Sequence, residues 1–152
     1  MNSAVCLASS KGIQISGPCI KGVRTTAYSS DPSDNGNWGP VTAVGTPLKS
    51  GKVTSAAADW SRYPVGTRFR IVETGQEYIV DDYGSALVGT GTIDLYKTSN
   101  SQVDRYGVRH VTIEIIEWGS PERSLEILKG RGKMRHIREM VEELQDQGVN
   151  VG

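Results

Sequence analysis

Four aspartates next to β-rich stretches are the residues of this chain best suited to chemistry. The stretch 77–96 contains Asp81, Asp82 and Asp94 around a glycine-rich bend, and Asp59 stands earlier, where a run of alanines meets a turn. Carboxyl groups gathered at one rim repel each other, so at least one of them would hold a proton near neutral pH. A protonated carboxyl is what a general acid needs. The plainer interpretation, that each aspartate caps a turn, stays open.

Two other arrangements of catalytic residues are incomplete. Asp82-Tyr83-Gly84 is close to the Asp-Thr-Gly of aspartic proteases, but those enzymes combine two such loops. Asp94 is followed by Leu95 and Tyr96, so the second loop is missing. Neither His110 nor His136 has a serine or cysteine motif beside it, which leaves a catalytic triad without support.

No metal or cofactor is predicted. The loop that begins at Asp31 offers calcium-type oxygen ligands and a glycine at the expected place, but Thr42 stands where an EF-hand has its closing glutamate. We therefore interpret it as a turn-rich surface loop. The two cysteines, Cys6 and Cys19, form no zinc motif, and either a disulfide or two free thiols is compatible with them.

Composition excludes several classes of protein. The 152 residues include 17 basic and 17 acidic ones, so the formal net charge is zero, which argues against a nucleic-acid-binding protein. The chain has no apolar run of the roughly 18 residues that a membrane span needs. The segment 1–12 lacks the apolar core of a complete signal peptide. The basic run 129–138 precedes several acids and is interpreted as a solvated helix face.

The elements expected to position the aspartates are short strands. Segments rich in β-formers and bounded by Gly or Pro turns predict a closed β-barrel. The predicted strands are 23–28, 41–44, 52–58, 68–73, 77–80, 93–96 and 108–118, preceded by an N-terminal arm, 1–22. A short helix is expected at 99–106, capped by Ser99 or Asn100.

A helical appendage is predicted after Gly119. Ser120 and Pro121 form a helix start, and apolar residues then recur at helical spacing, with Gly130 and Gly132 as a break. We divide the chain into the arm 1–22, the barrel 23–118 and this extension, 119–152. The barrel is expected to fold without the extension.

Five colinear segments resemble those of the 3D domain, a family named for three aspartates and related to the catalytic barrel of membrane-bound lytic transglycosylase A. They are Thr26-Ala27-Tyr28, Thr42 to Lys49, Ala57-Ala58-Asp59 followed by Tyr63 to Thr67, Asp82 to Gly89, and Ile93 to Tyr96. The resemblance implies a mainly β fold, a six-stranded double-psi β-barrel. It also implies a secreted, periplasmic or cell-envelope enzyme of bacterial or phage origin.

The activity that the resemblance implies is that of a peptidoglycan lytic transglycosylase. Such an enzyme cleaves the β-1,4 bond between N-acetylmuramic acid and N-acetylglucosamine and leaves a 1,6-anhydro product. Asp94 would be the single acid/base, with Asp82 and Asp59 supporting it and raising its pKa. Substrate-binding positions would be Tyr28, Thr46, Tyr83, Gly84, Ser85 and Tyr96.

The sequence departs from the family pattern at several places. Trp60 replaces the proline after the first aspartate, Ser85 replaces the second glycine of the bend, and Val88 replaces a lysine. The linker between Asp82 and Asp94 is one residue longer than usual, and a shift of about one ångström in a catalytic group can reduce the rate on the order of a hundredfold. A non-catalytic glycan-binding or structural barrel, of the cell envelope or of a phage particle, is therefore the alternative.

Overall fold

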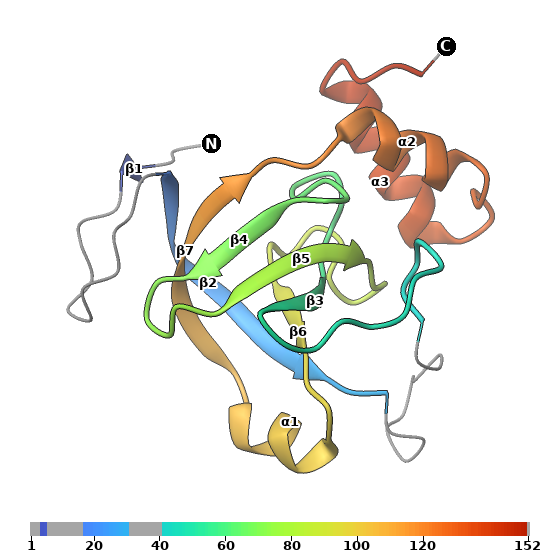
Figure 1. Ribbon diagram of the computed structural model, residues 1–152. Coiled ribbons are helices and arrows are strands. Elements are labelled where there is room, and N and C mark those ends of the chain that lie inside the picture. Colours follow the sequence, from blue (N-terminus) through green and yellow to red (C-terminus); the bar gives the residue numbers. More distant parts are fainter. Residues whose placement is uncertain (1–3, 6–16, 31–40, 152) are drawn as a thin grey trace.

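Six strands form a closed barrel in the computed structural model, which describes residues 4–5, 17–30 and 41–151 (Figure 1). The barrel strands are β2 (Pro18–Tyr28), β3 (Val53–Ala57), β4 (Arg68–Ile71), β5 (Glu77–Asp82), β6 (Ile93–Tyr96) and β7 (Arg109–Glu117). A two-residue strand, β1 (Ala4–Val5), pairs antiparallel with the start of β2. The predicted mainly β architecture is confirmed.

The order of the strands gives the barrel its double-psi topology. The neighbours run β2-β6-β3-β5-β4-β7, and a further β2–β7 pairing closes the ring. β2–β6 and β3–β5 are parallel, whereas the other barrel pairs are antiparallel. Closure removes the unpaired edges that an open sheet would present.

Alternating side chains fill the barrel. In β4, β5 and β6 alternate residues are apolar and point inside, as in a half-buried strand. Phe69 and Tyr78 stack on neighbouring strands with ring centroids 5.4 Å apart. The fully or nearly fully buried interior residues are Phe69, Ile71, Tyr78, Val80, Ile93, Leu95, Ile113 and Ile115.

Two strand predictions differ from the structure. β2 begins at Pro18, so residues 18–22 belong to the barrel and not to the arm. Residues 41–44 form no strand; only one isolated bridge, Val41 to Pro47, is made. The tight turn explains this: Gly45 has φ 83°, and the Thr42 amide already bonds the Thr46 carbonyl 2.8 Å away, so the segment folds back at once.

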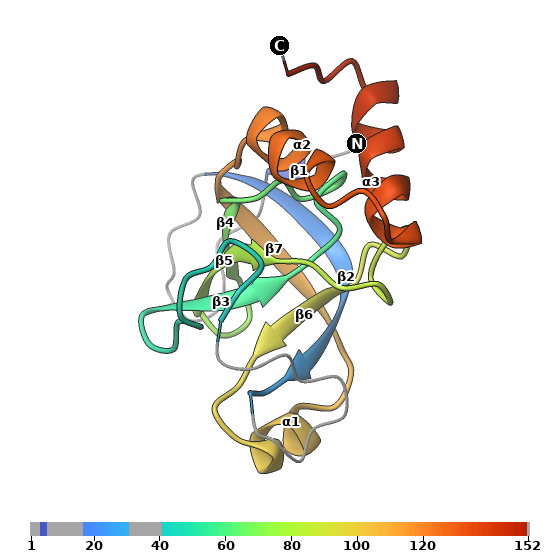
Figure 2. The ribbon, with the colours of Figure 1, turned by 90° about the vertical axis from the view of Figure 1, so that its right-hand side faces the viewer.

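Three helices lie at the two ends of the barrel (Figure 2). α1 (Asn100–Tyr106) occupies one end and is capped by Ser99, as predicted. α2 (Pro121–Lys129) and α3 (Arg135–Asp146) pack together at the other end. α2 begins at the predicted place, because the Ser120 side chain accepts the Arg123 amide and Pro121 occupies the first turn.

The C-terminal helices share the hydrophobic core of the barrel. Their buried residues Leu125, Leu128, Ile137, Met140 and Leu144 belong to one cluster with the barrel interior. The buried Ser124 hydroxyl accepts the Val65 amide at 2.8 Å, and the Ser120 amide donates to the Val65 carbonyl at 3.0 Å. The extension is thus built onto the barrel and is not a loosely attached appendage.

Cys19, at the start of β2, is buried and disulfide-bonded. The chain's other cysteine, Cys6, lies outside the described residues, as do Trp38 and the loop that begins at Asp31. Among the helices in the described parts of the chain, none is sufficiently long and apolar to cross a membrane.

Candidate active site

Asp82 and Asp94 flank the same residue of β3. Ala57 pairs with Asp82 on β5 and with Asp94 on β6, so the two acids lie on strands that flank β3. Neighbouring strands are about 4.8 Å apart, which places the two backbones about 10 Å from each other. The Asp94 charge makes a small contribution to the raised pKa of Asp82.

A β-bulge brings two acids to this side of β5. Ala56 pairs with Val80 and Ala57 with Asp82, which makes Asp81 the extra residue of the bulged strand. A bulge interrupts the strict alternation of side chains and re-aims the residue that follows it. Val80 points into the core, and Asp81 and Asp82 both act electrostatically on the Tyr28 hydroxyl.

Backbone amides hold Asp82. Its Oδ1 accepts the Tyr83 amide at 3.0 Å and the Ala43 amide at 3.2 Å. The pKa of this carboxyl is raised to about 6, mainly by burial; the two hydrogen bonds oppose the rise, and the nearby Asp81 and Asp94 add to it. Asp82 therefore binds a proton at a higher pH than an ordinary aspartate does.

Asp94 is half-buried on β6, and a residue of β2 orients its carboxyl group. The Thr26 hydroxyl donates to its Oδ1 at 2.8 Å, across the parallel register that pairs Thr26 with Asp94. Sequence reasoning placed Thr26 within a matching segment but assigned it no role. The pairing of β2 with β6, which could have revealed this role, is a long-range contact that no local pattern indicates.

Tyr28 and Tyr96 lie side by side near the acids. They are register partners, and their ring centroids are 5.7 Å apart. Burial, and then Asp82, Asp81 and Asp94, raise the pKa of the Tyr28 hydroxyl above its ordinary value. Because that hydroxyl keeps its proton and has no hydrogen-bond partner in the described chain, it is a donor held beside the acids.

Asp81 is the residue of this site that sequence reasoning set aside. It is 3% exposed; its Oδ2 accepts the Ser55 hydroxyl at 2.7 Å and lies 3.7 Å from the Lys49 ammonium. Its Oδ1 has no hydrogen-bond partner among the described residues. Burial raises the pKa of Asp81, while Ser55 and Lys49 oppose that rise.

Asp59 is directed away from this pair. Its Oδ1 accepts the amide and hydroxyl of Ser61, at 2.9 and 2.6 Å, and its Oδ2 accepts the Gly89 amide at 2.9 Å. The buried carboxyl therefore pins the bend 83–91 to the end of β3. This is the bend that joins Asp82 to Asp94, so Asp59 acts on the site through the backbone.

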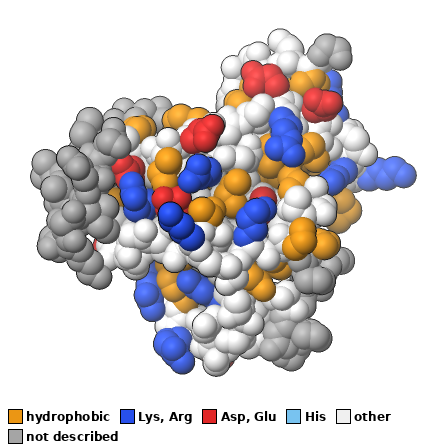
Figure 3. Space-filling model, in the orientation of Figure 1, with side chains coloured by type: hydrophobic (Ala, Val, Ile, Leu, Met, Phe, Trp, Pro, Cys, Tyr) orange, Lys and Arg blue, Asp and Glu red, His pale blue; other side chains and the backbone are white. Residues whose placement is uncertain are grey.

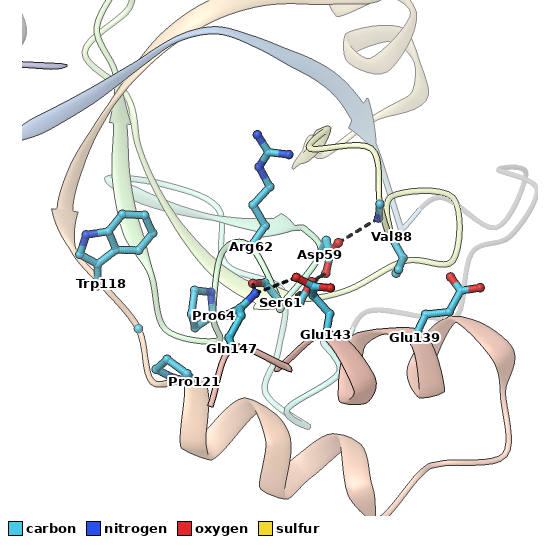
Figure 4. Close-up of a pocket in the computed structure, with 12 residues that line it drawn as sticks. Asp59, Ser61, Arg62, Pro64, Val88, Trp118, Pro121, Glu139, Glu143 and Gln147 are labelled. Atoms are coloured by element: carbon cyan, nitrogen blue, oxygen red, sulfur yellow. Dashed lines mark hydrogen bonds between the residues drawn. The ribbon is translucent and has the colours of Figure 1, made fainter. Parts of the chain in front are cut away.

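Asp59 also lines a groove between the barrel and the C-terminal helices (Figure 4). The groove has a volume of about 900 Å³. Arg62 and the half-exposed Trp118 line it from the barrel side, and Glu139 and Glu143 from α3. Asp82 and Asp94 are not among its lining residues.

The other predicted binding positions separate into two groups. The Thr46 hydroxyl lies 2.9 Å from that of Thr42, within the turn whose Ala43 amide bonds Asp82. Tyr83 contacts Trp60, with centroids 5.1 Å apart, and accepts a hydrogen bond from Arg131 at 3.3 Å.

Tyr83 therefore faces the C-terminal helices instead of the acid pair. Its ring also lies 5.9 Å from that of His136 on α3, measured between centroids. Gly84 and Ser85 form the turn after it: the Gly84 carbonyl accepts the Leu87 amide at 3.0 Å, and Ser85 is exposed. The described residues include no cluster of three or more His, Cys, Asp or Glu that could hold a metal ion.

A closed six-stranded double-psi barrel with two interacting aspartates beside β3 defines the class of this protein. The family model of the 3D domain matches residues 54–117, which include Asp59, Asp82 and Asp94. This part of the chain thus matches a family associated with the catalytic domains of lytic-transglycosylase-like enzymes. None of the curated proteins matches the chain.

Proposed function

We propose that this protein is a peptidoglycan lytic transglycosylase that acts at the cell envelope. The interacting pair of Asp82 and Asp94 is the observation that carries the proposal. With a pKa of about 6, Asp82 is ionised near neutral pH, and a negative charge favours the protonated form of a neighbouring carboxyl, which is the role we give to Asp94. That state suits acid catalysis near neutral pH.

In the proposed reaction one carboxyl acts twice. Asp94 donates its proton to the glycosidic oxygen as the bond from C1 of the muramoyl residue to that oxygen breaks. Asp94 then accepts the proton of the C6 hydroxyl as that oxygen forms a bond to C1. The ring closes to the 1,6-anhydro sugar, water is not consumed, and Asp94 is again protonated.

The surrounding residues support this cycle in different ways. Thr26 orients Asp94, and Asp82, whose pKa is raised to about 6, carries the charge that stabilises positive charge at C1. The buried Tyr28 hydroxyl keeps its proton beside the acids, and the rings of Tyr28 and Tyr96 pack on each other next to them. We assign Asp59 a positioning role, because its oxygens bond Ser61 and Gly89.

Digestion of purified peptidoglycan tests the proposal. The expected products are 1,6-anhydro-muropeptides, which lie one water lighter in a mass spectrum than hydrolysis products. Products with reducing ends would show that the protein is a hydrolase and not a transglycosylase. Binding to the glycan without release of fragments would favour the non-catalytic barrel.

Asp94→Asn separates catalysis from folding. The half-buried carboxyl is a hydrogen-bond acceptor for Thr26, and an amide oxygen preserves this contact but cannot cycle a proton. Activity is expected to fall by at least about a hundredfold, the lower range for loss of a general acid, with an unchanged circular dichroism spectrum. Asp104→Asn, at an exposed position of α1, is the control. An unfolded Asp94→Asn variant would assign the residue a structural role.

A further inference from the structure

A basic pocket lies at the end of the barrel that carries α1. It has a volume of about 500 Å³, and its cations are Lys97, Arg105 and Arg109. The residues that line it include no aspartate or glutamate. Figure 3 shows Lys and Arg side chains gathered beside hydrophobic ones at this lower end of the molecule. The chain as a whole is neutral, so this concentration of one sign of charge is local.

The three cations of the basic pocket have no acidic partner. None of them forms an ion pair with any residue that the structure describes; the ion-paired cations are Lys49, Arg68, Arg70 and Arg135. Arg109 instead donates to the backbone carbonyls of Tyr106 and Arg105, at 3.0 and 3.4 Å. The pocket therefore presents positive charge that no carboxylate among the described residues neutralises.

Two of these cations, Lys97 and Arg109, pack against aromatic rings. The Arg109 guanidinium lies 4.3 Å from the centroid of the Tyr106 ring, and the Lys97 ammonium lies 4.9 Å from it. Lys97 also donates to the Tyr78 hydroxyl at 3.3 Å. Burial and the neighbouring Arg109 lower the pKa of Lys97, so an anion bound between them would relieve both effects.

Tyr96 connects the basic pocket to the acid pair. It lines the pocket, its ring contacts Tyr28, and it lies two residues from Asp94 on β6. Lys97 follows directly, three residues from Asp94, which corresponds to about 10 Å of extended strand. An extended peptide of three residues spans the same length. A branch of three residues on a sugar bound at Asp94 therefore has the length needed to reach the pocket.

We propose that the basic pocket binds the free carboxylates of the peptide stems that branch from peptidoglycan strands. The identity of this ligand rests on the proposed function. Arginine recognises carboxylates through charge-assisted, paired hydrogen bonds, and Arg105 and Arg109 are both exposed at the pocket. The pocket thus makes the enzyme select glycan that still carries its peptides.

Binding of an isolated stem peptide tests the pocket independently of catalysis. The probes are a synthetic stem tripeptide with free carboxylates and the same peptide with every carboxyl amidated, titrated into the full-length protein by calorimetry. The free peptide is expected to bind at least about tenfold more tightly, because each charge-assisted hydrogen bond contributes roughly that factor. Equal binding of the two peptides would overturn the proposal.

The double variant Arg105→Gln, Arg109→Gln is expected to bind the free peptide at least about tenfold more weakly than the wild type. It should also bind the free and the amidated peptide with equal affinity. Arg138→Gln, at an exposed position on α3, is the matched control and is expected to change neither. Inorganic phosphate is the competitor: if it binds the wild type as tightly as the peptide does, the pocket is a general anion site and the peptide assignment is wrong.

A rate comparison separates this proposal from the proposed function. Strands with intact stems and strands stripped of peptides are digested in parallel, and the double variant is expected to lose the preference for the former. Anhydro products without peptide binding would contradict only the proposal that the pocket binds stem peptides. Peptide binding without any anhydro product would contradict only the proposed transglycosylase activity.

Discussion

Asp82 is expected to reduce the stability of the fold at neutral pH. Burial raises its pKa from 3.8 to about 6, so the folded state holds this proton more tightly than the unfolded state. The resulting stability is complete below about pH 4 and is lost as the pH rises through about 6, a change of up to about 3 kcal/mol.

Asp82→Asn is therefore expected to raise the free energy of unfolding at about pH 7.5 by about 2 kcal/mol. The amide cannot ionise, and its oxygen still accepts the Ala43 and Tyr83 amides. The gain should disappear near pH 4, which urea denaturation at several pH values would measure. Asp104→Asn is the control. A loss of stability that is the same at every pH would show that Asp82 is mainly a structural residue.

Single residues of the site differed in how far the sequence predicted them. Asp82 and Asp94 were nominated because both stand next to a glycine-rich bend, and the structure brings them together across Ala57. Asp81 was set aside because only Asp82 of the two successive acids matches the family motif, and strict alternation along a strand would place the two on opposite faces. The bulge at Asp81 breaks that alternation, and nothing in the local sequence indicates it.

At the scale of elements, strands with period-two alternation and helices with side-chain caps were predicted well. β7 and α2 are examples, since Val111, Ile113 and Ile115 alternate along one and Ser120 caps the other. The prediction of a strand at 41–44 was wrong, because its β-formers are followed at once by a turn at Gly45. Its role is instead to present the Ala43 amide to Asp82.

The junction between β7 and α2 depends on Gly119. A Cβ at this position would lie 2.1 Å from the Val65 carbonyl oxygen and 2.5 Å from the Thr67 amide nitrogen. Both atoms are backbone and cannot move aside, so Gly119→Ala is expected to cost about 3 kcal/mol of folding free energy. Thermal or urea denaturation would measure this loss.

Gly130→Ala is the matched control for that junction. It introduces the same methyl group after α2, where a Cβ would meet only the Ile127 carbonyl oxygen at 3.6 Å, an ordinary contact. Its stability should remain within about 0.5 kcal/mol of the wild type. Similar losses for the two variants would mean that close approach at Gly119 does not hold the junction.

The whole molecule folds around one core, although its sequence divides into a barrel and an extension. The apolar face of the two C-terminal helices was evident from its spacing, but its partner was not, because helical periodicity does not indicate which surface it covers. Leu125, Leu128 and Met140 are fully buried in the cluster that includes Trp60 and Val65. We therefore expect the stability of the barrel to depend on the helices.

Leu128→Ala tests this dependence in the full-length chain. Leu128 is 0% exposed, and truncating such a side chain costs about 2–5 kcal/mol. With one shared core the loss should appear in the whole molecule: amide hydrogen exchange should accelerate in β5 and β7 as much as in α2 and α3. Ile127→Ala, at a half-buried position of the same helix, should have a smaller effect. Acceleration confined to the helices would instead mean that the barrel folds alone.

Truncation after Gly119 is the stronger version of the same test. It removes five buried apolar helix side chains and exposes the barrel surface that they cover, including Val65, whose amide loses its Ser124 partner. Burial of one large apolar side chain contributes about 1.5–3 kcal/mol, and a domain is stable by only about 5–15 kcal/mol in total. The truncated chain is therefore expected to be insoluble or unfolded by circular dichroism. A soluble truncated chain with the cooperative unfolding of the full protein would restore the division into an independent barrel and a separate extension.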